Sequence, residues 1–211
     1  MPVTSPDRRP RLRLALAAAA LAFGLGRAAI ASEVTTPVEQ LHAGLIGIMK
    51  AGKATPFQKR YDMIAPVIGR TFDLEMILRQ VIGPRWASLP PPQQAALADA
   101  FRRYTIASYV ANFDTYLGQR FQIVPEVRPV GNDRVVETRI GSDTGKFHVL
   151  DYLMRREDRE WRVIDVLADG AISRVAAQRS EMRSVLSDSG GNGLLVSLRQ
   201  KTAELSGGIL Q

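Results

Sequence analysis

Few residues in this 211-residue chain could carry catalytic or metal chemistry. The chain has no cysteine, which excludes disulfides, thiolate metal sites and thiol nucleophiles. Its two histidines, His42 and His148, do not have the spacing of metal ligands. The sequence also has no phosphate-binding glycine loop, no dinucleotide fingerprint and no Gly-x-Ser-x-Gly nucleophile motif. It therefore predicts no metal, no cofactor and no covalent catalysis.

The remaining acid–base candidates lie in the second half of the chain. An aspartate and a tyrosine inside an apolar cone can transfer protons, as in enzymes of the ketosteroid-isomerase type. Tyr152 could act in this way with Asp165 or Asp151. Ordinary roles in turns, salt bridges and strand surfaces explain the same residues more simply. We keep this pocket enzyme as the alternative interpretation and assign no catalytic residue.

Two charged residues stand at positions where apolar residues are expected. Asp165 shares a strand face with Trp161 and Leu167, and Arg179 lies on the apolar stripe of a helix. A buried charge that has no partner costs several kcal/mol. We therefore predict that Asp165 and Arg179 form an ion pair, with the alternative that each side chain reaches solvent.

The first 31 residues have the three parts of a secretory signal peptide. Basic residues between positions 8 and 13 precede an apolar run over 14–25, and Ala29-Ile30-Ala31 provides a small-x-small cleavage site. The apolar run is too short to span a bilayer comfortably, and an uncleaved membrane anchor is the alternative. We expect residues 32–211 to form one exported domain in the periplasm.

The formal net charge of +7 first suggests an anionic partner such as nucleic acid. Much of this excess lies in the signal segment, in Arg8, Arg9, Arg11, Arg13 and Arg27. Because cleavage removes these residues, we expect no nucleic-acid partner.

The hydrophobic pattern predicts helices at both ends of the mature domain. Asp73 is placed to cap a short helix that begins at Leu74, and Gly83-Pro84 ends it. The glycines over 190–193 interrupt the last helical stretch. The predicted helical segments are 36–83, 93–117, 172–187 and 194–205.

Between these helices, the period of the hydrophobic pattern changes to two. Short turns separate the strands, and such turns favour antiparallel pairing because parallel crossovers need a dozen residues or more. The sequence therefore predicts an α+β fold with an antiparallel meander sheet of about four strands. The predicted strands are 120–128, 134–140, 146–155 and 160–168.

The long helix over 93–117 has apolar residues on two opposed faces. Leu97, Phe101 and Tyr104 share one face. The other face has Ile106, Val110, Phe113 and Leu117, with Tyr109 at its border. A helix that is apolar on two sides is buried on both or faces a ligand cavity. Both possibilities stay open at this point.

A set of short segments occurs along most of the mature chain in a fixed order. The segments are Arg60-Tyr61, IAPVI at 64–68, FDL at 72–74, VIGPRW at 81–86, Tyr109, Tyr152-Leu153, WRVIDV at 161–166 and Gln178-Arg179-Ser180. This ordered set resembles the toluene-tolerance or MlaC family. The residues at 177–182 and 193–203 are more similar to the hopanoid-biosynthesis-associated branch, although the segment 170–173 departs mildly from the usual pattern.

The resemblance implies a periplasmic lipid carrier without catalytic activity. Its partners would be an outer-membrane lipoprotein complex and an inner-membrane transporter with MCE domains and an ABC ATPase. The implied fold is a twisted antiparallel sheet packed with N- and C-terminal helices around an apolar lipid cavity. Phospholipid and hopanoid both stay open as the ligand.

We expect the lipid tails to lie against the second apolar face of the long helix, because the first face already provides packing. Apolar residues from the early helices and the sheet would complete the wall. The predicted lipid-binding residues are Ile64, Val67, Ile68, Leu74, Ile77, Leu78, Ile82, Ile106, Tyr109, Val110, Phe113, Leu117, Leu150, Tyr152 and Ile164.

The signal-peptide interpretation predicts where the mature chain begins. N-terminal sequencing of the exported protein should start at Ser32, because cleavage follows Ala31. A periplasmic pool that still carries Met1, or that only detergent releases, would contradict the prediction.

Overall fold

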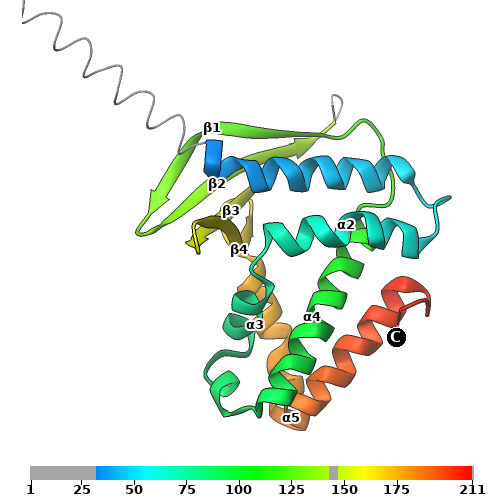
Figure 1. Ribbon diagram of the computed structural model, residues 1–211. Helices are drawn as coiled ribbons and strands as arrows, with labels where there is room; N and C mark the ends of the chain where they lie inside the picture. The colour runs from blue at the N-terminus through cyan, green and yellow to red at the C-terminus, as the bar shows by residue number, and fades with distance from the viewer. Residues whose placement is uncertain (1–31, 143–146, 211) are drawn as a thin grey trace, which may run out of the picture.

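An antiparallel sheet and the helices beside it make up the structure, a computed structural model that describes residues 32–142 and 147–210 (Figure 1). The predicted signal peptide lies outside these residues. Within them, no helix combines the length and the apolar character needed to cross a membrane. The arrangement confirms the predicted α+β class.

The sheet has five strands in the order β1-β2-β3-β4-β5, all paired antiparallel. In the tight turn between β3 and β4, Asp158 and Arg159 have φ angles of 45° and 72°. Such left-handed turns suit the twist of a hairpin. The predicted meander is therefore correct, and β5 is an addition too short to show a periodic pattern. The bounds are β1 Arg120–Val130, β2 Asp133–Gly141, β3 His148–Glu157, β4 Glu160–Ala168 and β5 Ile172–Ser173.

A bulge in β4 changes which of its residues face the helices. Met154 pairs with Val163 and Leu153 pairs with Asp165, so Ile164 is an extra residue in the ladder. Residues that pair across strands share a face. Trp161 and Val163 therefore lie on the same face as Val166, and the strict alternation expected from the sequence is wrong at this point.

The helices follow the predicted order with shifted ends. Asp73 caps α3 as predicted, because its carboxylate accepts a hydrogen bond of 2.9 Å from the Met76 N–H. The long helix α4 ends at Asn112, before the predicted end at Leu117. In α5, Gly190 has a φ of 63°, which confirms the predicted interruption. The helices are residues 32–51, α2 Phe57–Thr71, α3 Leu74–Ile82, the 3-10 turn η1 Gly83–Ser88, α4 Pro91–Asn112 and α5 Arg174–Ser206.

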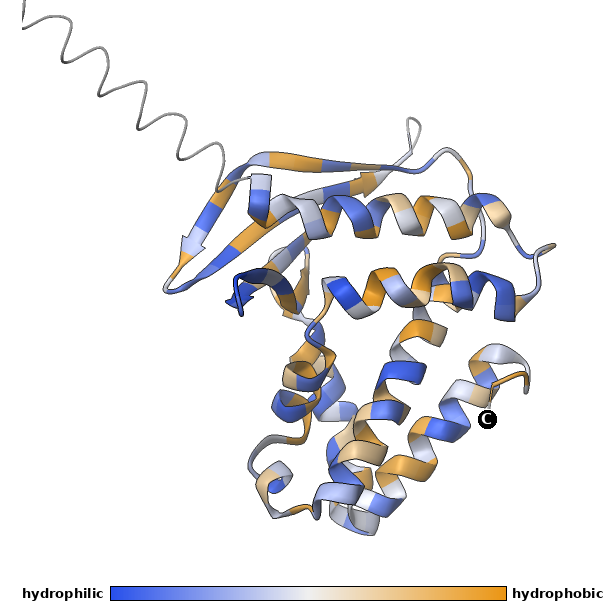
Figure 2. Cartoon of the chain, in the orientation of Figure 1, coloured by the Kyte–Doolittle hydropathy of each residue, from blue (hydrophilic) through white to orange (hydrophobic). Residues whose placement is uncertain are grey.

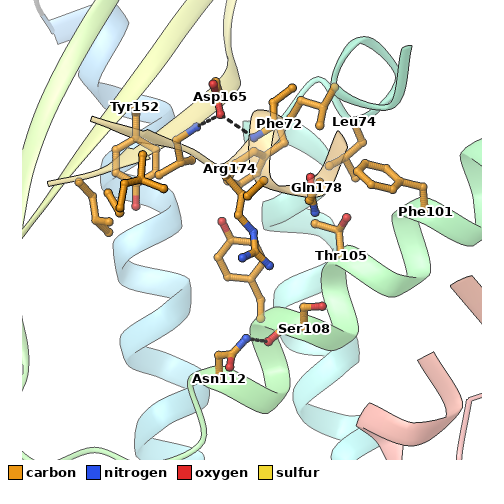
Figure 3. A pocket seen from close by; sticks show the side chains of 18 of the residues that line it. Phe72, Leu74, Phe101, Thr105, Ser108, Asn112, Tyr152, Asp165, Arg174 and Gln178 are labelled. Carbon is orange, nitrogen blue, oxygen red and sulfur yellow. Dashed lines mark hydrogen bonds between the residues drawn. The ribbon is translucent and has the colours of Figure 1, made fainter. Parts of the chain in front are cut away.

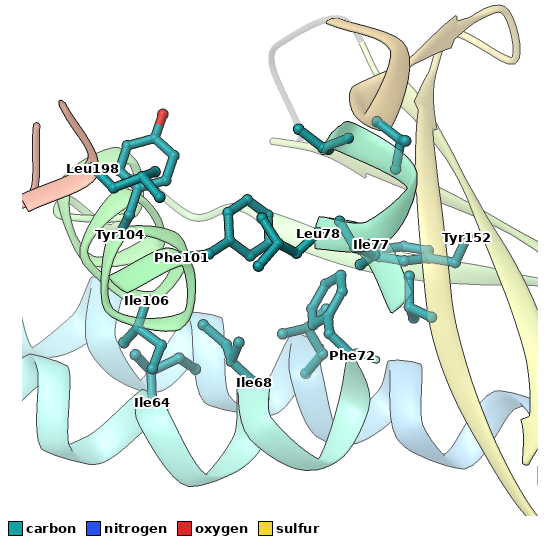
Figure 4. Close-up of a cluster of buried hydrophobic side chains, with 14 of the residues drawn as sticks. Ile64, Ile68, Phe72, Ile77, Leu78, Phe101, Tyr104, Ile106, Tyr152 and Leu198 are labelled. Atoms are coloured by element: carbon teal, nitrogen blue, oxygen red, sulfur yellow. The ribbon is translucent and has the colours of Figure 1, made fainter. Parts of the chain in front are cut away.

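The core lies where the helical layers meet each other and the sheet (Figure 4). The hydropathy colouring in Figure 2 shows apolar stripes along the helices next to polar ones. Gly44 lets the N-terminal helix approach α2 closely, since an added Cβ would lie 2.7 Å from Cδ1 of Ile64. Phe101 and Leu78, from α4 and α3, pack in the same cluster.

A buried arginine joins the start of α2 to the end of α4. Arg60 is 6% exposed. Its Nη1 donates to the carbonyl of Val110 at 3.0 Å, and its Nε donates to the carbonyl of Thr55 at 3.2 Å. The guanidinium also lies 5.7 Å from the centre of the Phe57 ring. The Val110 carbonyl lies in the last turn of α4, where carbonyls lack partners within the helix, and Arg60 supplies a donor for it.

Replacing this arginine should destabilise the protein. We expect Arg60→Met to lower the free energy of unfolding by about 1–3 kcal/mol, because a buried carbonyl loses its donor. The measurement is denaturant unfolding. Lys59→Met, at an exposed neighbouring position, should change stability by less than about 0.5 kcal/mol. Equal effects of the two substitutions would show that the Arg60 contacts contribute nothing specific.

Candidate functional site

A cavity of about 330 Å³ lies between the sheet, α3, α4 and the first turns of α5 (Figure 3). This volume is at the lower end of the roughly 300–1,000 Å³ found for ligand pockets. Its walls are mainly apolar, with polar groups contributed by α4, β4 and α5. The lining residues are Phe72, Leu74, Ile77, Phe101, Thr105, Ser108, Tyr109, Asn112, Phe113, Leu150, Tyr152, Asp165, Val166, Ala168, Ile172, Arg174, Val175, Ala177 and Gln178.

The carboxylate of Asp165 fixes one wall of the cavity by holding the start of α5 against β4. It accepts a hydrogen bond from the Val175 N–H at 3.1 Å and another from the Ser173 hydroxyl. Ser173 in turn caps the helix, since its Oγ accepts from the Ala176 N–H at 3.0 Å. A carboxylate is favoured here because it faces unpaired N–H groups and the positive end of the helix dipole.

One stripe of α4 forms the wall that faces this turn. Phe101, Thr105, Ser108, Tyr109 and Asn112 recur at intervals of three and four residues, which places them on the same side of the helix. Phe101 of the first apolar face and Tyr109 at the border of the second belong to this stripe, and Thr105, Ser108 and Asn112 lie between the two faces. An analysis of hydrophobic periodicity does not detect this stripe, because most of its members are polar or small. The spacing of these residues by three and four positions is the sequence feature that places them on one side of the helix.

The cavity includes only part of the predicted tail-binding set. Two buried members, Ile106 and Val110, lie on the second face of α4, and Val110 is 0% exposed. At these two residues the second face is packed core, whereas Phe113 of the same face and Tyr109 at its border line the cavity. Leu117 lies beyond the end of α4 and is 74% exposed. The predicted residues that line the cavity are Leu74, Ile77, Tyr109, Phe113, Leu150 and Tyr152.

The other predicted residues pack elsewhere for two reasons. Most belong to helix faces that meet other helices, as Figure 4 shows for Ile64 and Ile68. The bulge at Ile164 removes that residue from the alternation on which its assignment depended. The predicted residues outside the cavity lining are Ile64, Val67, Ile68, Leu78, Ile82, Ile106, Val110, Leu117 and Ile164.

The predicted ion pair between Asp165 and Arg179 is replaced by two separate interactions. Asp165 binds the first turn of α5, as described above. Arg179 donates from Nε to the carbonyl of Gln80 at 2.8 Å, near the end of α3. Unpaired carbonyls and the negative end of a helix dipole attract a guanidinium there. No ion pair joins the two residues, both of which belong to the described part of the chain.

A chain of aromatic rings connects the cavity to the N-terminal helix. Tyr109 lies 5.9 Å from Phe113, and Phe113 lies 6.4 Å from Phe121, measured between ring centres. Phe121 stacks on His42 at 4.4 Å, and His42 meets the edge of Tyr152 at 5.8 Å. Rings at these separations attract one another beyond their burial alone.

Burial keeps the polar groups of this aromatic chain uncharged. It raises the pKa of Tyr109 and, more strongly, that of Tyr152, so both hydroxyls stay protonated near neutral pH. It lowers the pKa of His42 to about 4, because the imidazolium would lose its hydration. Nε2 of His42 has no hydrogen-bond partner among the described residues.

Comparisons with known proteins identify the family of the chain and a solved structure of similar fold. A family model described as MlaC protein matches residues 39–200. A solved phospholipid-binding protein from Ralstonia solanacearum, in complex with a phospholipid, is similar in fold with a TM-score of 0.70. The two chains are 22% identical, and the match covers 83% of this chain and 97% of the Ralstonia chain. No curated protein matches the chain.

The buried histidine predicts a pH dependence of stability. Between pH 6.5 and about 4 the unfolded chain binds a proton that the folded chain does not. The free energy of unfolding should therefore fall as the pH drops through this window, by about 3 kcal/mol in total from His42. Unfolding measured at pH 7 and pH 4 should show a smaller difference for His42→Leu than for the wild type.

His148 provides the matched control for this experiment, because it is exposed at the start of β3. The difference between His42→Leu and His148→Leu separates the effect of the buried site from the loss of an imidazole in general. Carboxylates that titrate in the same range contribute equally to all three proteins and cancel in the comparison. If His42→Leu lost as much stability on acidification as the wild type, His42 would not be the group responsible.

Proposed function

The chain belongs to the MlaC family, and from this membership and its cavity we propose that it is a periplasmic lipid-binding protein. The observation that carries the proposal is the apolar cavity, which is enclosed by buried rings such as Phe72 and Phe101 and reaches the surface near Ile172. The Ralstonia protein of similar fold is described as holding a phospholipid. A cavity of this kind suits the apolar tails of a lipid.

A lipid-binding protein can act as a carrier because moving a free lipid through water costs a large free energy. Moving an acyl chain of about sixteen carbons into water costs roughly 0.8 kcal/mol per methylene, on the order of 13 kcal/mol in all. Unassisted crossing of the periplasm is therefore slow. We propose that the protein moves lipid between an outer-membrane lipoprotein complex and an inner-membrane transporter with MCE domains and an ABC ATPase. Binding and release would require no covalent chemistry on this chain.

The alternative of a pocket enzyme rests on Asp165 and Tyr152, which both line the cavity. A general base needs a free lone pair within hydrogen-bond reach of the substrate. The oxygens of Asp165 already accept three hydrogen bonds, from Ser173, Val175 and its neighbour Val166, at 2.8 Å for the last, which use most of their lone pairs. These contacts give Asp165 a structural task, so the geometry favours binding over proton transfer.

Filling the cavity should reduce lipid binding without harming the fold. Ala177 lines the cavity on α5, and its neighbour Ala176 is exposed outside the lining. We expect Ala177→Phe to lower the lipid bound per protein several-fold, because the ring occupies space that the tails need. The measurement pairs native mass spectrometry with lipid extraction and denaturant unfolding on the same sample.

The control is Ala176→Phe, which has the same helix-propensity cost and no access to the cavity. It should bind as much lipid as the wild type. If Ala177→Phe kept its lipid and lost about 1–3 kcal/mol of stability, the site would be packed core and the proposal would fail. Wild-type protein that takes up no lipid from vesicles would also contradict it.

A further inference from the structure

Among the residues that line the mainly apolar cavity, Arg174 is the one that carries a positive charge. Arg174 is the first residue of α5, and Figure 3 shows its side chain pointing from that helix towards α4. Its charge is close enough to Tyr109 to oppose part of the rise in the pKa of that hydroxyl. Among residues 32–142 and 147–210, no hydrogen bond or ion pair engages the guanidinium. An arginine with its donors free is available to an anionic ligand.

The only carboxylate in the cavity lining is already committed to other donors. The oxygens of Asp165 accept hydrogen bonds from the Val166 and Val175 N–H groups and from the Ser173 hydroxyl. The Ala176 N–H is used by Ser173. The first turn of α5 is therefore capped by its own side chains. What remains for a ligand is the Arg174 guanidinium, rather than the end of the helix.

The position of Arg174 divides the cavity into two ends. Among the lining residues, Arg174 and Asn112 are exposed and Ile172 is 65% exposed, so the cavity opens to water where these residues lie. Towards the other end lie the buried side chains Ile77 and Phe101. Between the two ends, the Thr105 hydroxyl is buried and has no partner within the described residues. A ligand that fits a cavity with a buried apolar end and a cationic, exposed end has an apolar body and an anionic head at the mouth.

We propose that Arg174 binds the phosphodiester of a phospholipid whose tails occupy the buried end of the cavity. The inference rests on the proposed lipid-binding function and adds the class of lipid. A guanidinium matches phosphate oxygens with two parallel charge-assisted hydrogen bonds. A hopanoid body or a diacylglycerol, which has no anionic head, leaves Arg174 unpaired. Arg174 therefore selects phospholipids over neutral lipids of similar apolar surface.

A competition between two lipids with identical tails tests this selection. Delipidated protein is incubated with vesicles that contain dioleoyl phosphatidylglycerol and dioleoylglycerol, and native mass spectrometry gives the ratio of the two bound lipids. The wild type should take up phosphatidylglycerol in preference. Arg174→Gln should reduce that preference about tenfold, as expected for the loss of a charge-assisted hydrogen-bond pair. Arg174→Lys, which keeps the charge, should lose less.

Arg183→Gln is the matched control, because Arg183 is exposed on the same helix and outside the cavity lining. It should keep the wild-type ratio. An unchanged ratio in Arg174→Gln, or an equal fall in Arg183→Gln, overturns the role of Arg174 and leaves lipid binding intact. Uptake of neither lipid by the wild type instead overturns the proposed function itself. Unfolding of each variant confirms that the fold is retained.

Discussion

The hydrogen bonds of Asp165 to the first turn of α5 are the constraint on which the cavity depends. They join β4 to a helix that begins only a few residues later in the chain. This connection places Val175, Ala177 and Gln178 opposite the stripe of α4 that begins at Phe101. Because backbone groups of its first turn are bonded to Asp165, α5 cannot rotate its side chains away from α4 without losing those hydrogen bonds. The open space is therefore built into the backbone arrangement.

The rest of the molecule is packed so that this space stays open. Residues of α4 outside the cavity stripe, such as Leu97 and Ile106, are buried against neighbouring helices. Arg60 fixes the end of the same helix through the Val110 carbonyl. Close packing on these sides holds α4 at a set distance from the sheet, because interiors resist changes in volume. The polar stripe is compatible with this arrangement since its hydroxyls can bond within the helix, as Ser108 does with the Tyr104 carbonyl.

Local sequence signals predicted the elements, and they failed where tertiary structure sets the direction of a side chain. The Asp73 cap, the meander turns and the break at Gly190 each depend on a few neighbouring residues, and each was correct. The bulge at Ile164 reverses the faces of β4, and alternation alone gives no sign of one inserted residue. The predicted tail-binding set and the cavity lining differ for a related reason. Apolar residues occur both in the packed core and in the cavity lining. The sequence alone therefore does not show which of the two the second face of α4 belongs to, because that depends on the elements that pack against it.

The position of the Arg174 guanidinium at the mouth of the cavity suits a protein that is proposed to release its ligand to a partner. A fully buried ion pair would make release slow, because one partner would be left charged and dehydrated when the other departs. Arg174 is exposed, so water can solvate its guanidinium as the head group leaves. Screening at such a site weakens the attraction, yet geometry still separates a phosphodiester from a neutral head. Selectivity then comes from the mouth and most of the affinity from the tails, whose burial does not depend on the identity of the head group.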